Sequence, residues 1–360
     1  EILQTDPLFK NELRYNELGG GIEWRGEALS DGLFSEMLAT IRKKYNLEQV
    51  HKSNLFDEVY GEAYSHKYNS VKSYLHSLKW DGTERVARIA SDILGCQEDI
   101  ASTFVKRWLI SAVQRVEIPG SKADSILILV GGQGVGKSTF FEILGGKWHS
   151  DTAMDLGFNL KDAQQALQSI WICEWAELDT MKHPRNVSKV KAFLSQREDH
   201  FRRSYGRVHE KNKRTVVFCG TTNEHNFLFD ETGNRRFWAI QCGERIRTDI
   251  LAKTRDQIWA EAFEMHKAGE QSYLTQEEAK ASEHQNQTYK PERPIFERVK
   301  ELIPEDRMEI RFVQVLTLLG IDCFRVPHSI NQEVCSALIA LGFSNKTAMR
   351  NGKEARVWVH

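Results

Sequence analysis

The chain has 360 residues, with 49 lysines and arginines against 50 aspartates and glutamates, and its formal net charge is −1. Hydrophobic residues make up 41% of it, which is enough for a buried core and excludes an intrinsically disordered chain. No apolar run approaches the roughly 20 residues that cross a bilayer, and the first residues lack the basic-then-apolar pattern of a secretory signal, so we expect a cytoplasmic protein without a membrane partner.

Residues 1–119 are predicted to form a mostly helical N-terminal region. Apolar side chains recur at helical spacing in two stretches between residues 84 and 117, which predicts two amphipathic helices there. Pro119 and Gly120 end the second helix, because proline and glycine both interrupt helices.

A core domain is predicted over residues 120–270, where strand and helix patterns alternate. The short apolar segments that indicate buried strands are Ile126–Val130, Ile170–Cys173, Val216–Cys219 and Phe237–Ile240. Helical stretches lie between them, and this alternation is typical of a mostly parallel α/β sheet. Residues 271–294 are polar and end in two prolines, so we expect a helix and a linker there.

Residues 295–360 are predicted to form a separate C-terminal domain. Apolar spacing indicates helices near residues 295–303, 311–319 and 330–341. Asn351 and Gly352 are a typical two-residue turn between two short strands. Three helices followed by a hairpin predict a winged-helix-like domain.

A glycine-rich motif follows the first predicted strand. Residues 131–138 read Gly-Gly-Gln-Gly-Val-Gly-Lys-Ser, which matches G-x-x-x-x-G-K-[ST] between a strand and a helix. In such a P-loop the backbone N–H groups converge on the phosphates of ATP, the lysine bridges the phosphates, and the serine hydroxyl binds Mg²⁺. An ordinary glycine-rich turn would not need lysine and serine in this register. The predicted nucleotide-binding residues are Gly131, Gly134, Gly136, Lys137, Ser138 and Thr139.

Two carboxylates, Glu174 and Glu177, follow the second predicted strand. Carboxyl ends of parallel strands share one edge of a sheet, so both should lie beside the P-loop. One would hold Mg²⁺ through water while the other polarises the attacking water, although either alone could be a solvated residue at a helix start. We predict Ser138 and Glu174 as the metal site. The spacing leaves the base open between Glu174 and Glu177, and we favour Glu177.

Polar groups also flank the two later strands. Asn223 follows the third strand, where its amide could orient water against the γ-phosphate, although asparagine also caps turns. Arg235 and Arg236 precede the last strand. We interpret one of these arginines as a finger that reaches the nucleotide of a neighbouring subunit, with a solvent-facing structural role as the alternative.

The near-neutral net charge conceals a basic segment. Residues 182–214 contain eleven lysines and arginines against three acidic residues, a local net charge of +8, so the rest of the chain carries −9. Interspersed aromatic residues and histidines suit phosphate contact and base stacking on DNA, although a solvated charged run is the alternative. Residues 202–214 are predicted to form a hairpin with a basic tip near residues 209–213. Lying beside Asn223, this hairpin should move with nucleotide state.

These motifs resemble the virulence-associated protein E family and, more broadly, the superfamily 3 helicases of phages, plasmids and small DNA viruses. Three further segments carry the resemblance: Tyr74–Arg85, which reads YLHSLKWDGTER, Pro119–Asp124 and Gly233–Trp238. The match covers about residues 70–245. It implies an AAA+-type P-loop sheet, with the asparagine strand between the P-loop strand and the glutamate strand. It also implies a ring, usually a hexamer, in a bacterial cell, with DNA passing through its centre.

The resemblance extends to individual site residues. The residues that match the superfamily's ATPase motifs are Lys137 and Ser138 of Walker A, Glu174 and Glu177 of Walker B, Asn223 as sensor 1, and Arg235 or Arg236 as the finger. The implied DNA-binding residues are Lys191, Arg202 and Arg203, and, by position alone, His209, Lys211 and Lys213 of the hairpin.

The leading hypothesis is an ATP-hydrolysing DNA helicase or translocase of a phage or mobile element. It would act as a homo-oligomeric ring in replication initiation, use ATP and Mg²⁺, hold single-stranded DNA in its channel and contact duplex DNA with its C-terminal domain. The alternative is an ATP-gated DNA-binding switch or interference protein without processive unwinding. A metabolite kinase is disfavoured, because the basic segment and the arginine pair would then have no role.

Overall fold

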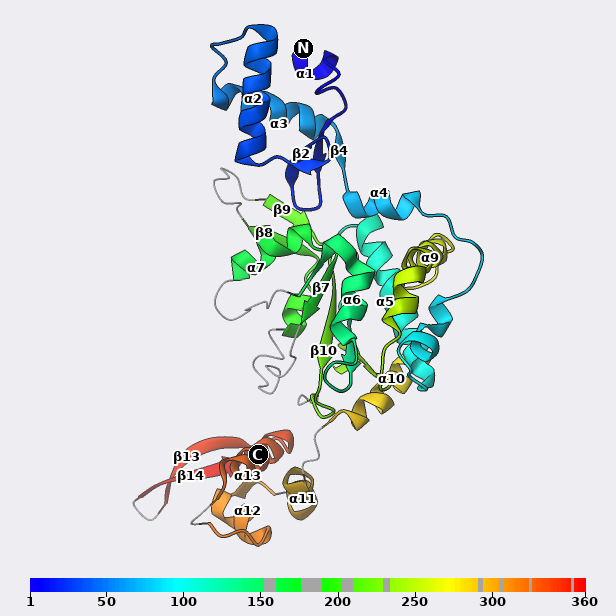
Figure 1. Ribbon diagram of the computed structural model, residues 1–360. Coiled ribbons are helices and arrows are strands. Elements are labelled where there is room, and N and C mark those ends of the chain that lie inside the picture. The colour runs from blue at the N-terminus through cyan, green and yellow to red at the C-terminus, as the bar shows by residue number, and fades with distance from the viewer. Residues whose placement is uncertain are drawn as a thin grey trace. The chain divides into compact units, whose positions relative to one another are not determined.

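The computed structural model describes residues 1–151, 160–175, 190–201, 210–228, 234–290, 294–304, 307–323, 326–350 and 353–360. The chain divides into two units, Glu1–Lys290 and Pro291–His360 (Figure 1). None of the described helices combines the length and the apolar character needed to span a membrane.

The first part of the chain forms a small sheet with helices and a core of its own. Its strands, in the order β3-β2-β1-β4, are β1 (Leu13–Asn16), β2 (Gly21–Trp24), β3 (Glu27–Ala28) and β4 (Lys67–Tyr68). Its helices are α1 (Ile2–Thr5), α2 (Asp31–Tyr45) and α3 (Lys52–Ser65). Phe9 and Trp24 stack in this core with ring centroids 5.7 Å apart. Helices predominate up to residue 119, but this sheet is a feature that the sequence pattern did not predict.

Helices follow this sheet and lead to the core domain. Helix α5 (Asp99–Glu117) confirms one of the two helices predicted between residues 84 and 117. The other stretch is helical only over residues 86–93, where η1 (Val86–Arg88) is a 3₁₀ helix and η2 (Ile89–Ile93) is a π-helix rather than the single amphipathic α-helix that the pattern predicts. Glu261 accepts hydrogen bonds of 2.7 and 2.9 Å from two main-chain N–H groups at the start of this segment, which ties it to a neighbouring helix. The flanking helices are α4 (Ser70–Ser77) and α9 (Thr248–Lys267).

Five parallel strands form the central sheet in the order β11-β5-β10-β7-β6. They are β5 (Ile126–Val130), β6 (His149–Ser150), β7 (Ile172–Trp175), β10 (Val217–Thr222) and β11 (Phe237–Gln241). The fold is therefore mixed α/β with a parallel sheet, and β10 lies between β5 and β7, the order that the resemblance implies. All four predicted strands are present. β7 begins two residues later than predicted, and the two-residue edge strand β6 was not predicted.

Both faces of this sheet are covered, which is why β5 is apolar at every position. Side chains alternate along a strand, so Leu127 and Leu129 contribute to one core and Ile126, Ile128 and Val130 to the other. The first core contains α5, α9 and α6 (Lys137–Gly145), which lie together in Figure 1. The remaining elements around the sheet are η3 (Gly146–Trp148), α7 (Leu160–Ala166), η4 (Leu167–Ser169), η6 (Asn234–Arg236) and α10 (Gln276–Thr288).

A separate antiparallel pair lies within the basic segment. Strands β8 (Glu198–Phe201) and β9 (Glu210–Lys213) pair from Glu198 opposite Lys213 to Phe201 opposite Glu210. Because β9 ends shortly before β10 begins, the pair leaves the amino edge of the central sheet.

Over its described residues, the second unit has three helices and an antiparallel sheet of order β12-β14-β13. Its elements are α11 (Pro294–Leu302), β12 (Glu309–Ile310), α12 (Phe312–Leu318), α13 (His328–Ala340), β13 (Ser344–Arg350) and β14 (Lys353–Val359). The three predicted helices and the hairpin are present, while the predicted turn at residues 351–352 lies outside the described residues. Phe296, Leu338 and Trp358 belong to the core of this unit.

Candidate functional site

Loop 131–136 joins β5 to α6 in a conformation that suits glycine. Gly134 and Gly136 have φ angles of 81° and 102°, in the left-handed region where a side chain is strained. Residues 246–248, which lead into α9, pack against the loop. The N–H of Ile246 donates to the carbonyl of Val135 at 2.9 Å, and a Cβ atom on Gly136 would lie 3.4 Å from Thr248 at the start of α9. Two of the predicted glycines are therefore required by the shape of this loop.

Lys137, the first residue of α6, turns its ammonium back toward the loop. Its Nζ donates to the carbonyls of Gly131 at 2.9 Å and Gly132 at 2.7 Å, and to Oδ1 of Asn223 at 2.8 Å. Lys137 is 7% exposed, and this burial lowers its pKa, although the nearby Glu174 favours the charged form. The structure thus brings Lys137 of α6 and Asn223 after β10 into direct contact.

Glu174, the third residue of β7, is 1% exposed and accepts three hydrogen bonds. Ser138 Oγ at 2.7 Å and Thr221 Oγ1 at 3.0 Å donate to Oε1, and His149 Nε2 lies 3.2 Å from Oε2. Burial alone would raise the pKa of this carboxyl, but the bonds from His149, Ser138 and Thr221 outweigh burial and lower the pKa below its usual range. An ionised carboxylate is therefore kept beside the hydroxyl of Ser138.

Two members of this group, Thr221 and His149, were not predicted. Thr221 lies two residues before Asn223, so the alternation of side chains along β10 could have identified it. His149 belongs to the short edge strand β6. It lies against the last residue of α6, because a Cβ atom on Gly145 would be only 2.7 Å from His149 Cβ. Of the other predicted residues, Thr139 is exposed on α6, and Glu177 lies outside the described residues.

The arginine pair lies at the amino edge of the sheet, where the parallel strands begin, whereas the residues described above lie at the carboxyl edge, where the strands end. Arg235 and Arg236 form the η6 turn just before β11, and β11 pairs with β5 in parallel register, Phe237 opposite Ile126. The loop that carries Lys137 follows the other end of β5, so the five-residue strand, about 16 Å long, separates the two sites. Arg235 is exposed, while Arg236 is partly buried with Nε 3.9 Å from Asp124. The structure does not bring these arginines to Lys137 within one chain.

The predicted hairpin is present, but its boundaries and place differ from the prediction. Lys211 and Lys213 lie within strand β9, so the tip is not at residues 209–213. The pair leaves the amino edge of the sheet, whereas Asn223 follows β10 at the carboxyl edge, so the hairpin is not beside Asn223. The physical reason is that β10 itself, about 20 Å of extended chain, separates them. Lys211 and Lys213 are exposed, and Lys191 is partly buried in the helical residues 190–194. Arg202, Arg203 and His209 lie outside the described residues.

One arginine of the basic segment, Arg214, is buried and therefore not available to DNA. Arg214 and Asp199 are fully buried, and the guanidinium bonds the carboxylate through Nε at 2.9 Å and Nη2 at 2.7 Å. Arg214 Nη1 also donates to the carbonyl of Phe193, whose ring lies 4.2 Å from the guanidinium carbon. Burial, together with the positive charge of Arg214, lowers the pKa of the neighbouring Arg115 to about 10. Arg214 therefore anchors the base of the hairpin.

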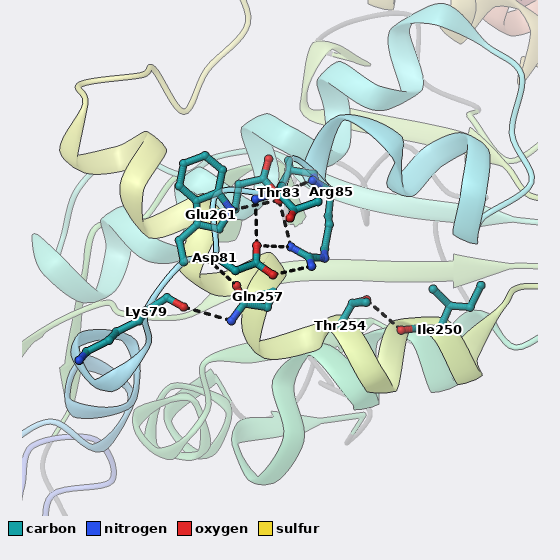
Figure 2. Close-up of polar contacts among 10 residues, drawn as sticks. Lys79, Asp81, Thr83, Arg85, Ile250, Thr254, Gln257 and Glu261 are labelled. Carbon is teal, nitrogen blue, oxygen red and sulfur yellow. Dashed lines mark hydrogen bonds and ion pairs between the residues drawn. The ribbon is translucent and has the colours of Figure 1, made fainter.

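The Tyr74–Arg85 motif has a structural role on α9 (Figure 2). Asp81 binds the guanidinium of Arg85 through both oxygens, at 2.8 and 2.7 Å. Gln257 of α9 donates to the carbonyl of Lys79 at 3.1 Å and accepts from the N–H of Asp81 at 2.9 Å. The motif thus clamps the middle of the helix whose first turn contacts the glycine-rich loop.

Comparisons with known proteins agree with this architecture. A family model described as the virulence-associated protein E-like domain matches residues 75–291. Two solved structures described as the apo A form of the NrS-1 C-terminal region are also similar, both at 12% sequence identity. One has a TM-score of 0.52 and the match covers 96% of each chain, and the other has a TM-score of 0.51 with 97% of this chain and 94% of that chain covered. At this identity the likeness concerns the fold alone. No match was found among curated proteins.

Proposed function

Because the chain belongs to the virulence-associated protein E-like family, we propose that it is an ATP-hydrolysing DNA helicase or translocase of a phage or mobile element that acts in replication initiation. One observation supports this most directly. At the carboxyl edge of the sheet, Lys137 meets Asn223, and the neighbouring Ser138 meets the buried carboxylate of Glu174. In this proposal residues 131–138 are a P-loop and the sheet is the core of an AAA+-type ATPase of the superfamily 3 kind.

The side chains at this edge fit ATP and Mg²⁺. Lys137 is held by neutral oxygens, which a phosphate would replace with a charged and stronger acceptor. Ser138 Oγ and Glu174 Oε1 are 2.7 Å apart and offer the hard oxygen ligands that Mg²⁺ prefers, in addition to water and phosphate oxygens. When bound, Mg²⁺ neutralises charge on the phosphates. The exposed amide of Asn223 would orient the attacking water, and we favour Glu177 as its base.

The arginine pair would complete the site of a neighbouring subunit. Neither arginine can act on the loop of its own chain, because the length of β5 separates them. A finger supplied in trans requires assembly, and we propose a homo-oligomeric ring, a hexamer as is usual in the superfamily. Arg235 is the better candidate for the finger because its side chain is exposed.

DNA would bind through the basic segment of residues 182–214. Lys211 and Lys213 are exposed on β9, where their charges can meet backbone phosphates of single-stranded DNA in the channel. Lys191, Arg202, Arg203 and His209 are proposed, from the sequence, to contact DNA as well. The second unit, with three helices and a hairpin, would act as a winged helix on duplex DNA.

Strand displacement at saturating ATP tests the proposal. The full chain should convert a forked DNA substrate to single strands, and Lys137→Ala should not. Lys147→Ala, which changes an exposed lysine just after α6, is the matched control and should unwind like the unchanged protein. ATP hydrolysis with tight DNA binding but without strand separation would favour the alternative, an ATP-gated DNA-binding switch or interference protein. No binding of ATP by the oligomer would overturn both.

A further inference from the structure

The turn that carries the arginine pair is held from inside by two buried side chains. Asn286 of α10 donates from Nδ2 to the carbonyl of Asn234 at 3.0 Å and to that of Phe237 at 3.2 Å. Trp238 donates from Nε1 to the carbonyl of Arg235 at 3.2 Å. Asn286 and Trp238 are each 2% exposed. The carbonyls of residues 234, 235 and 237 therefore each accept a hydrogen bond from a buried side chain.

These bonds limit how the turn can move. A 3₁₀ turn of three residues has few internal hydrogen bonds, so its orientation depends on outside partners. A backbone rotation of the turn that redirects the Cα–Cβ bond of Arg235 would break the bonds to Asn286 and Trp238. The bond to the carbonyl of Phe237 is buried and the other two are partly buried. Carbonyls with little access to water are rarely left without a partner, so such a rotation is unfavourable.

Helix α10 is itself fixed to the sheet. The residue before Asn286, Gln285, donates to the carbonyl of Ala239 at 3.1 Å, so two successive residues of α10 bind the backbone of β11 and the turn before it. At the other end of the helix, Glu278 forms an ion pair with Arg107 of α5 at 2.8 Å. The position of the Asn286 amide is therefore set by contacts along the whole helix.

The backbone of the turn is held by hydrogen bonds, whereas the side chain of Arg235 is held by none among the described residues. Within the described part of the chain, no hydrogen bond or ion pair engages the side chain of Arg235, and the nearest acidic oxygen to Arg236 Nε is 3.9 Å away on Asp124. A cavity of about 420 Å³ lies beside the pair and includes Lys280 and Lys290 in its wall. A rigid backbone with an unengaged guanidinium is the arrangement expected of a group that acts on another molecule.

We propose that Asn286 is a positioning residue for the arginine finger. It acts through the backbone of residues 234–237, and it sets the direction in which the side chain of Arg235 projects from the subunit surface. This inference rests on the proposed function, since it requires that the arginine acts on the nucleotide of a neighbouring subunit. The segment around Asn286 is polar and reads as a helix before a linker, so its sequence alone gives no sign of this role.

The test replaces Asn286 by Asp, which keeps the shape of the side chain but removes both donated hydrogen bonds when ionised and one of them when protonated. Turnover of ATP by Asn286→Asp should fall about 10- to 100-fold, because a misplaced catalytic group is slow even when it is present. Affinity for ATP should stay within about twofold, because the nucleotide contacts lie at the other edge of the sheet. His284→Ala, at an exposed position of α10 that does not line the cavity beside the arginine pair, is the matched control and should hydrolyse ATP normally.

Mixing of subunits separates this role from a general structural defect. Lys137→Ala subunits have a defective nucleotide site but intact fingers, so mixing them with Asn286→Asp subunits should raise hydrolysis well above the sum of the separate rates. The positive control is the same mixture with the double variant Arg235→Ala, Arg236→Ala. Restoration in the control but not with Asn286→Asp would overturn the inference alone. No restoration in the control would overturn the finger in trans, and the inference with it.

A second variant covers the possibility that Asn286→Asp does not fold. Trp238→Phe removes the indole donor to Arg235 and keeps a ring that can stack on Phe104, whose centroid lies 5.7 Å away. It should show the same pattern, with lower turnover, retained ATP affinity and rescue by Lys137→Ala subunits. Turnover equal to that of the unchanged protein in either folded variant would contradict the proposal.

Discussion

Charged side chains at the carboxyl edge and at the amino edge of the central sheet lie in different environments. At the carboxyl edge, Lys137 and Glu174 are buried and each is held by three hydrogen bonds from the same chain. At the amino edge, the backbone around Arg235 is held by buried donors, while its guanidinium is exposed. The charged groups at the carboxyl edge are thus hydrogen-bonded within the subunit, whereas the guanidinium of Arg235 at the amino edge faces outward.

One chain can therefore carry two halves of an active site that are completed only between neighbouring subunits. The groups proposed to bind ATP are preorganised within the subunit, so no second chain is needed to hold the nucleotide. The group proposed to stabilise the transition state is about the length of β5 away from them, so hydrolysis would need a neighbour. The contrast predicts that binding and turnover can be lost separately.

The largest expected effect is that of Lys137→Ala at the carboxyl edge. Hydrolysis of ATP should fall to background and affinity for ATP should weaken, because the ammonium proposed to bridge the phosphates is removed. Binding of a fluorescent ATP analogue and release of phosphate measure the two effects. Lys147→Ala serves as the control. Normal turnover by Lys137→Ala would mean that the carboxyl edge is not the nucleotide site.

The double variant Arg235→Ala, Arg236→Ala tests the amino edge in the same assays. Turnover should fall about 1,000-fold, since an arginine finger contributes at least this much, while ATP affinity is retained. Arg88→Ala, at an exposed arginine of η1, is the control and should change neither quantity. If ATP affinity is lost as severely as turnover, the two edges do not have the separate roles proposed for them.

Asp199→Asn tests whether a third arginine at the amino edge is structural. It leaves the buried guanidinium of Arg214 without its countercharge, so the free energy of unfolding should fall by about 3–5 kcal/mol. Urea denaturation measures the loss, with Glu198→Gln at the exposed neighbouring position as the control. A loss below about 1 kcal/mol, typical of an exposed ion pair, would show that Arg214 is solvated and free to meet DNA.

The sequence predicts the carboxyl edge better than the amino edge for a physical reason. Strand β5 and its loop are encoded locally, by five consecutive apolar residues and by glycines at positions whose φ angles require them. Lys137, Ser138 and Asn223 follow directly from that motif and from the ends of adjacent strands. The strands of the N-terminal sheet have only two to four residues, too few for a clear alternating pattern, and β4 pairs with β1 from about 50 residues away.

The missed residues all act through contacts between distant parts of the chain. His149 lies 25 residues from Glu174, and Asn286 lies 52 residues from Asn234. In the basic segment, Arg214 and Lys211 look alike in sequence, and only the buried partner Asp199 distinguishes an anchor from an exposed charge. The net charge of that segment therefore overstated the charge available to DNA.

His149→Ala sharpens the description of the carboxyl edge with a smaller effect. Loss of the donor to Glu174 Oε2 leaves the carboxylate less well oriented, so ATP hydrolysis should need about tenfold more Mg²⁺ to reach half its maximal rate. His149→Gln can keep an N–H donor near the same point and should recover most of the loss. An Mg²⁺ titration of the ATPase rate measures both. Equal Mg²⁺ dependence in all three proteins would show that His149 only fills space beside Gly145.

The smallest effect is expected from the exposed lysines of the hairpin. Lys211→Ala with Lys213→Ala removes two charges from β9 without touching the buried anchor at Arg214, so folding should be unchanged. If both contact phosphates, the slope of log affinity for single-stranded DNA against log salt should become about 1.4 units shallower, since each phosphate contact on a single strand contributes about 0.7. Lys253→Ala with Lys267→Ala, at exposed lysines on α9, is the control pair. An unchanged slope in the hairpin variant would leave the amino edge with one outward-facing function, that of the arginine pair, and would place the DNA contacts elsewhere on the chain.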